Sequence, residues 1–134
     1  MISHHAALIY TMVLVSAADR DMSDAELRAI GEIVNFLPVF RDYDPNLLPA
    51  TAEACAELLG ADEDLERAFE LIKSSLPPKL RETAYALACD VAVAGGELSQ
   101  DILRVLELIR HRLDIDRLVA AAIERGARAR FRTV

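Results

Sequence analysis

The chain lacks tryptophan, has only two cysteines among its 134 residues, and contains no stretch in which polar and apolar residues alternate. Without that alternation, half-buried β-strands are not indicated, and a 53% hydrophobic composition rich in Ala and Leu predicts an all-α protein. Neither Cys55 nor Cys89 belongs to a Cys-x-x-Cys or Cys/His ligand spacing. We interpret both as small buried hydrophobic residues of a protein in a reducing cytosol.

Basic residues are scarce over most of the chain. Residues 1–100 carry 7 basic and 17 acidic side chains, whereas residues 101–134 carry 8 basic and 5 acidic ones, and the formal net charge is −7. Phosphate contacts supply most of the affinity of nucleic-acid-binding proteins, so this balance argues against a nucleic-acid partner. The Arg-bearing end is more typical of a self-complementary packing surface, as in a homodimer, or of a solubility device.

Charged residues are absent from the first 18 positions, which are strongly apolar from Ala6 onward. The segment lacks the basic start of a signal peptide and is short for a membrane span of ~20 residues. We therefore predict a buried central helix, no membrane span and a cytoplasmic protein. A chain of this length can bury roughly two-thirds of its unfolded surface, so we expect a single domain over residues 1–134.

Two segments 76 positions apart share one pattern, an apolar helix followed by a short polar turn and a second helix. Laid over each other, they align Ser23 with Ser99, Leu27 with Leu103, and Ile33 with Ile109. We predict two pseudo-symmetric helix-turn-helix halves, about residues 6–37 and 82–113, that cover each other's apolar faces in one compact domain. The aligned leucines and the aligned isoleucines are both expected in the core.

Helical periodicity and capping signals predict about seven helices. Their expected ranges are 3–18, 23–37, 49–59, 62–75, 78–94, 99–113 and 116–125. Ser23 and Glu26 have the Ser-x-x-Glu spacing of a capping box, and Gly60 stands where a left-handed helix cap is expected. The last nine residues, 126–134, are expected to be frayed or to lie on the body.

The first turn concentrates oxygen donors. Asp19-x-Asp21-x-Ser23 has the spacing of the first three ligands of an EF-hand loop, but the glycine and the last glutamate of that motif are missing, which excludes a true EF-hand. Asp19 follows a helix end, whose negative pole disfavours a carboxylate by about 0.3–1 kcal/mol unless a cation is bound. We interpret Asp19, Asp21 and Glu26 as candidate ligands of Ca²⁺, Mg²⁺ or Mn²⁺. The alternative is a solvated acidic turn in which Glu26 only caps a helix.

Two further acidic residues lie in or near the second turn, Glu97 within it and Asp90 before it. Asp90 is the only charged residue between positions 82 and 97, in an otherwise apolar helix. A carboxylate in such surroundings should be at least partly buried and should meet a cation. That cation is either a metal shared with the first turn or an arginine, such as Arg81 or Arg104.

Nitrogen ligands and catalytic groups are few. One residue of the pair His4 and His5 could bind a metal near a carboxylate cluster, but adjacent side chains diverge, so zinc is less expected than a hard cation. Exposed N-terminal histidines are the alternative. The chain contains no nucleophile paired with a base, no Gly-rich phosphate loop and no His-x-x-x-His spacing, so we predict that it is not an enzyme.

An apolar helix ends in Ala17-Ala18-Asp19, a serine follows with a glutamate three residues later, and residues 92–99 (AVAGGELS) repeat the same pattern. With these motifs, the chain resembles the TerB-like family of tellurite-resistance proteins over about residues 6–125. The resemblance implies an all-helical fold of about seven helices with internal pseudo-symmetry and a cytoplasmic bacterial setting. It also implies no established enzymatic activity and a divalent-metal site built from acidic residues at the turns.

The family's acidic positions are only partly kept. In the first turn, the family's aspartate and glutamate fall on Asp19 and Glu26, whereas in the second turn they fall on Gly95 and Ile102. The resemblance therefore implies a metal site centred on the first turn, with help from Asp90 or from the glutamate of the second turn.

Two hypotheses of function follow. The first is a small non-enzymatic protein of the tellurite-resistance and stress-response type, which holds a divalent cation at its acidic turn and contacts partner proteins through its helical surface. The alternative is a metal-free helical interaction module, recruited through the hydrophobic and Arg-rich surface near the C-terminus.

Overall fold

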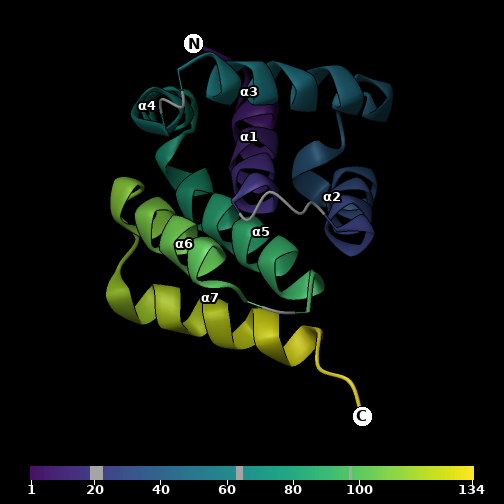
Figure 1. Ribbon diagram of the computed structural model, residues 1–134, viewed down its shortest axis with the longest axis vertical. Helices are drawn as coiled ribbons and strands as arrows, with labels where there is room; N and C mark the ends of the chain where they lie inside the picture. Colours follow the sequence, from purple (N-terminus) through teal and green to yellow (C-terminus); the bar gives the residue numbers. More distant parts are fainter. Residues whose placement is uncertain (19–22, 63–64, 97) are drawn as a thin grey trace.

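The fold is known from a computed structural model that describes residues 1–18, 23–62, 65–96 and 98–134. These residues form seven α-helices and three short 3-10 helices and contain no strand, which confirms the predicted all-α class (Figure 1). The α-helices are α1 His4–Ala17, α2 Asp24–Phe36, α3 Leu48–Asp62, α4 Leu65–Ser75, α5 Arg81–Ala94, α6 Gln100–Arg112 and α7 Arg117–Arg130. The 3-10 helices are Pro38–Phe40, Pro45–Leu47 and Pro78–Leu80.

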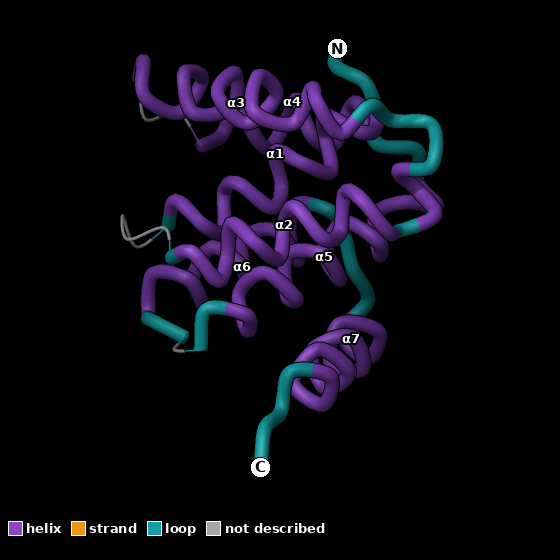
Figure 2. The backbone as a smooth tube through the Cα atoms, turned by 90° about the vertical axis from the view of Figure 1, so that its right-hand side faces the viewer, coloured by secondary structure: helices purple, strands orange, loops and turns teal. Residues whose placement is uncertain are grey.

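Helix α1 runs through the middle of the molecule, as its uniformly apolar sequence predicts. Residues 7–16 are all buried, and α1 contacts each of the helices from α2 to α6. Ser3 caps its first turn, because the Ser3 side chain accepts a hydrogen bond from the Ala6 N–H. Figures 1 and 2 show α3 at one end of the molecule and α7 at the other.

Helix α7 is longer than predicted. It packs on α5 and continues to Arg130 instead of ending near Arg125. Gly126 in a helix costs about 1 kcal/mol relative to alanine, but the next residue, Ala127, is fully buried, and this packing holds the last turn in place. Gly60 likewise lies inside α3 and does not cap it.

The aligned positions of α2 and α6 divide between core and surface. Ile33 and Ile109 are buried, as predicted, but Leu27 and Leu103 are 47% and 42% exposed, so their placement in the core was wrong. Each leucine follows a buried residue, and one step along a helix turns a side chain by about 100°, away from the buried stripe. The exposed leucine pair contradicts the core placement on which the predicted duplication rested, so the internal repeat is not confirmed.

Candidate metal site at the helical turns

The site predicted from the sequence is only partly described by the structure. Glu26, on the first turn of α2, and Asp90, near the end of α5, are described. Asp19, Asp21 and Glu97 lie outside the described residues. The geometry of the candidate site is therefore known only at Glu26 and Asp90.

Glu26 is held by a complete capping box at the start of α2. The Ser23 Oγ accepts a hydrogen bond from the Glu26 N–H at 3.1 Å. In return, the Ser23 N–H and Oγ–H both donate to Glu26 Oε1, each at 3.0 Å. This reciprocal arrangement fixes the carboxylate at the helix N-terminus, where the helix dipole favours negative charge.

The second carboxylate oxygen of Glu26 has no such partner. Glu26 is 2% exposed, and its Oε2 atom is buried without a hydrogen bond to any of the described residues. A buried polar atom left unpaired costs about 1–3 kcal/mol, and more when it is charged. This oxygen is therefore free to accept a bond from a ligand.

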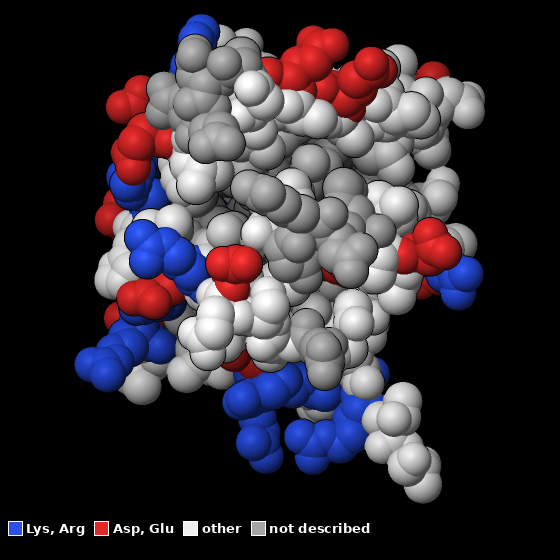
Figure 3. All heavy atoms as spheres, viewed as in Figure 1, with Lys and Arg blue, Asp and Glu red and all other residues white. Residues whose placement is uncertain are grey.

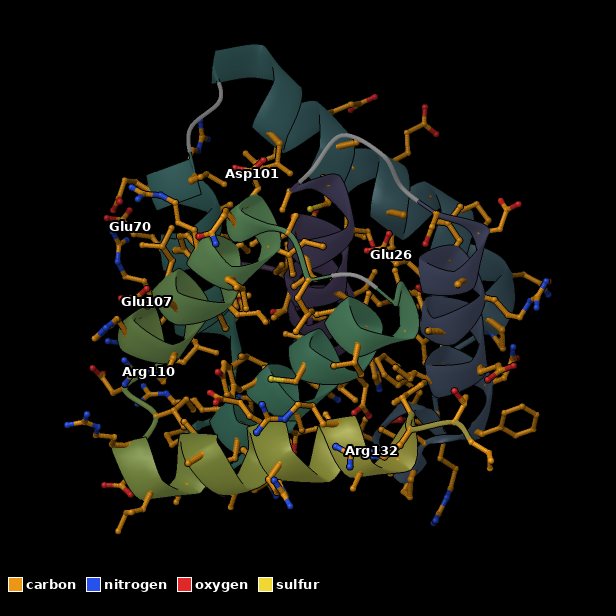
Figure 4. The ribbon with its side chains drawn as sticks, turned by 60° about the horizontal axis from the view of Figure 1, so that its bottom comes forward. Glu26, Glu70, Asp101, Glu107, Arg110 and Arg132 are labelled. Carbon is orange, nitrogen blue, oxygen red and sulfur yellow. The ribbon has the colours of Figure 1, made fainter. Side chains whose placement is uncertain are left out.

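Glycine at position 95 brings the two turns together. Gly95 caps the end of α5, and a Cβ atom there would come within 3.2 Å of Glu26 Cγ and 3.3 Å of Cδ. Figure 4 shows Glu26 at the start of α2 beside the end of α5. In the sequence, Gly95 appears only as a lost acidic position. The structure shows that the missing side chain makes room for the glutamate.

The electrostatic surroundings of Glu26 are mixed. The start of α2 favours the carboxylate, but the carboxylate also lies against the C-terminal end of α5, where unpaired carbonyl groups create a negative pole. A carboxylate next to carbonyl oxygens is a suitable environment for a hard cation, which prefers oxygen ligands.

The position of α6 that aligns with Glu26 of α2 is apolar. Ser99 caps α6 by accepting a hydrogen bond from the Ile102 N–H at 3.2 Å, and Ile102, 1% exposed, occupies the place that Glu26 has in α2. Since an isoleucine fills this buried position in one hairpin, a buried carboxylate is not needed to build the turn.

Asp90 pairs with an arginine of α7. Arg130 Nη2 donates to Asp90 Oδ1 at 2.5 Å, and the two side chains are 56% and 18% exposed. The expectation of a partly buried carboxylate that meets a basic side chain is confirmed, but the partner is neither Arg81 nor Arg104. Sequence reasoning missed Arg130 because it placed the residue in a frayed tail. A metal-binding role for Asp90 stays a prediction.

The histidines lie at the other end of α1. His5, 8% exposed, is not an exposed terminal residue: its Nε2 lies 3.0 Å from the Val39 carbonyl oxygen and 3.1 Å from Asp42 Oδ1. Its ring also packs beside Phe40 and Tyr43. The described part of the chain contains no group of three or more His, Cys, Asp or Glu side chains placed to hold a metal.

The cysteines are buried and unpaired, as predicted. Burial raises the pKa of the Cys55 thiol and that of the Cys89 thiol from 9.0 to about 12. Both thiols are therefore protonated at neutral pH, which makes them poor nucleophiles and poor metal ligands.

A groove that the sequence did not reveal lies between α5, α6 and α7. It has a volume of about 260 Å³, and its lining includes Cys89 and the exposed side chains of Leu98 and Leu103. At one wall, the Tyr85 hydroxyl donates to Glu124 Oε2 at 2.6 Å, and burial raises the pKa of that tyrosine. No signal in the sequence indicated this groove, because helical periodicity had placed Leu103 in the core.

These features define a small all-α protein in which a buried carboxylate lies where two helical turns meet. The family model described as "Tellurite resistance protein TerB" matches residues 5–125, and the chain belongs to the TerB family. No curated protein and no solved structure matches the chain. None of the helices among the described residues is long and apolar enough to cross a membrane.

Proposed function

We propose that this TerB-family protein binds a divalent cation, Ca²⁺, Mg²⁺ or Mn²⁺, at the acidic turn between α1 and α2, and that it contacts partner proteins without catalysing a reaction. Glu26 is the proposed fixed ligand. Asp19 and Asp21 are the proposed ligands from the turn itself, and Glu97 is a proposed contributor from the second turn. Tellurite resistance or a related stress response is the proposed setting.

The observation that supports this proposal is the unpaired Oε2 of the buried Glu26. Its Oε1 already satisfies the capping box, so capping alone explains only half of the carboxylate. The aligned position of α6 holds a buried isoleucine, Ile102, so a helix start capped by serine does not require a carboxylate there. A cation would pair with the free oxygen and would also neutralise the negative pole at the end of α5.

The alternative function, a metal-free interaction module, is supported by a different observation. Leu98 and Leu103 are 39% and 42% exposed and line the groove between α5, α6 and α7. Exposed apolar side chains around a groove are typical of surfaces that bind other proteins. This surface is compatible with the cation site, so the two functions can belong to one protein.

The test is the melting temperature of the protein with and without each cation. A ligand present at 100 times its dissociation constant adds about 2.7 kcal/mol to the free energy of unfolding. We expect one or more of Ca²⁺, Mg²⁺ and Mn²⁺ to raise the melting temperature. We expect Asp19→Ala to abolish this increase and to leave the metal-free protein folded.

Asp24→Asn is the matched control, since Asp24 is an exposed acidic residue on the same first turn of α2. It removes one negative charge but no buried oxygen, so the cation-dependent increase should remain. If none of the cations changes the melting temperature of the wild-type protein, the proposal is wrong. If Asp19→Ala responds as the wild type does, the cation binds elsewhere.

A further inference from the structure

An exposed side of α7 carries a stripe of arginines, one of which, Arg128, also lines the groove between α5, α6 and α7. Arg117, Arg125, Arg128 and Arg132 are all exposed, and the spacing of the first three, together with Ala121, places them on one side of the helix. Arg132 lies two residues beyond the end of α7, and Figure 4 labels it there. Within the part of the chain that the structure describes, none of these four guanidinium groups forms an ion pair. By contrast, Arg130 on the inner side pairs with Asp90.

The outer face of α3 has the opposite charge and likewise contains small residues. Glu53 and Glu57 are exposed one helical turn apart, with exposed Ala50 and Ala54 on the same side, and neither glutamate forms an ion pair with any described residue. The α7 stripe also contains a small residue, Ala121, and Ala122 and Ala129 lie beside it. Small side chains on both faces would allow the two helices to approach closely.

The two faces lie too far apart to meet within one chain. Figures 1 and 2 show α3 and α7 at opposite ends of the longest axis of the molecule. In Figure 3, basic side chains gather over α7 and acidic ones over α3. Each molecule therefore presents a basic helix face at one end and an acidic helix face at the other.

We propose that the chain associates with a second copy of itself head to tail, with the arginine stripe of α7 against the acidic face of α3. The pairing aligns Arg125 and Arg128, separated by about 4.5 Å along the axis of α7, with Glu53 and Glu57, separated by about 6 Å along the axis of α3. A contact between two different faces leaves one of each free, so the assembly grows as a chain or closes as a ring.

Charge complementarity favours this partner over others. A two-fold dimer through α7 would place arginine against arginine, which is repulsive. Nucleic acids and anionic membranes are less suitable partners, because both are negatively charged. The protein has a net charge of −7, with 17 acidic side chains in residues 1–100, and would repel them. The acidic face of another copy carries small residues that match those of the stripe. The association is therefore heterologous and differs from the symmetric homodimer that the charge distribution alone suggests.

The experiment is sedimentation velocity of the full chain over a range of protein concentrations at two salt concentrations. Between about 10 mM and about 1 M salt, the Debye length falls from about 30 Å to about 3 Å, which screens exposed ion pairs. At low salt, we expect the average mass to rise with concentration above the 14.8 kDa of one chain. At high salt, it should return to that mass.

Charge reversal identifies the two faces. R125E/R128E and E53R/E57R should each raise the apparent dissociation constant by about tenfold or more. An equal mixture of these two variants should associate again, because the reversed, acidic α7 of one variant meets the reversed, basic α3 of the other, and their unreversed faces stay complementary. The control variant is R41E/K79E, which reverses two exposed basic residues outside both faces and should associate like the wild type. Circular dichroism checks that each variant is folded.

Three outcomes would overturn the proposal. The first is a mass of one chain at every concentration in low salt. The second is association that survives both double reversals or that the mixture does not restore. The third is binding to phosphatidylglycerol vesicles that R125E/R128E loses, without self-association of the wild type, because the stripe would then serve a membrane surface.

Discussion

Replacing Glu26 by glutamine tests the candidate site with the smallest structural change. The amide of glutamine keeps one carbonyl oxygen that can accept the bonds from the Ser23 N–H and Oγ–H, so the capping box survives. The change removes the negative charge and replaces the unpaired oxygen, Oε2, by an NH₂ group. We expect the free energy of unfolding of the metal-free protein to change by about 1 kcal/mol or less.

The effect on the cation response should be much larger. At a cation concentration 100 times the wild-type dissociation constant, binding adds about 2.7 kcal/mol, which corresponds to roughly 10 °C in a protein of this size. If Glu26→Gln weakens binding a hundredfold, the same cation concentration adds only about 0.4 kcal/mol. The increase in melting temperature should then fall to about 1 or 2 °C.

Differential scanning fluorimetry or calorimetry measures both quantities, with Asp24→Asn as the variant of equal charge. Glu26→Ile adds a second comparison, since it copies the isoleucine of α6 and should fold without responding to cations. The reasoning is refuted if Glu26→Gln keeps the full cation response of the wild type. It is also refuted if Glu26→Gln unfolds the metal-free protein, because the carboxylate would then be a structural element of the turn.

Three further predictions concern Asp90, Gly95 and the two buried cysteines. Asp90→Asn should cost about 1 kcal/mol or less in denaturant unfolding, because Arg130 is half exposed, and should leave the cation response unchanged. Gly95→Val places a side chain where a Cβ alone would lie 3.2 Å from Glu26 Cγ, so the cation response should shrink in thermal melting. Both thiols have a native pKa of about 12 and an ordinary pKa of 9.0, so the stability that they contribute is present below pH 9 and is lost as the pH rises toward 12. Replacing both cysteines by alanine should flatten that decline in denaturant titrations.

Each of these predictions has a contrary result. If Asp90→Asn loses the cation response, Asp90 is a ligand of the metal site and not only the partner of Arg130. A normal response in Gly95→Val would show that the close approach of Gly95 to Glu26 is not required. Rapid reaction of the native thiols with a disulfide reagent at pH 8 would contradict their burial.

Local sequence signals predicted the helices well. Ser23 and Ser99 start α2 and α6 because a serine oxygen satisfies a backbone N–H of the next turn, an interaction within a few residues. The apolar sequence of α1 required a central position for the same reason that any uniformly apolar helix does. The ends of α3 and α7 lie beyond their predicted positions, and at Gly126 the packing of Ala127 outweighs a local cost of about 1 kcal/mol.

The candidate site was predicted only in part. The sequence placed Glu26 in a capping box, but the burial of its second oxygen depends on Gly95, which is 69 positions away in the chain. The arginine partner of Asp90 depended on α7 continuing five residues beyond its predicted end. Periodicity alone did not separate Leu103, at the edge of the apolar face, from its buried neighbours.

The sequence by itself determined the all-α class, the buried central helix and the caps of α2 and α6, because these follow from periodicity and from bonds between near neighbours. Only the tertiary structure decided that Glu26 lies against Gly95, that Asp90 pairs with Arg130, and that α3 and α7 present opposite charges at opposite ends. These relations join residues far apart in the chain. They depend on how helices pack against one another, which no local pattern specifies.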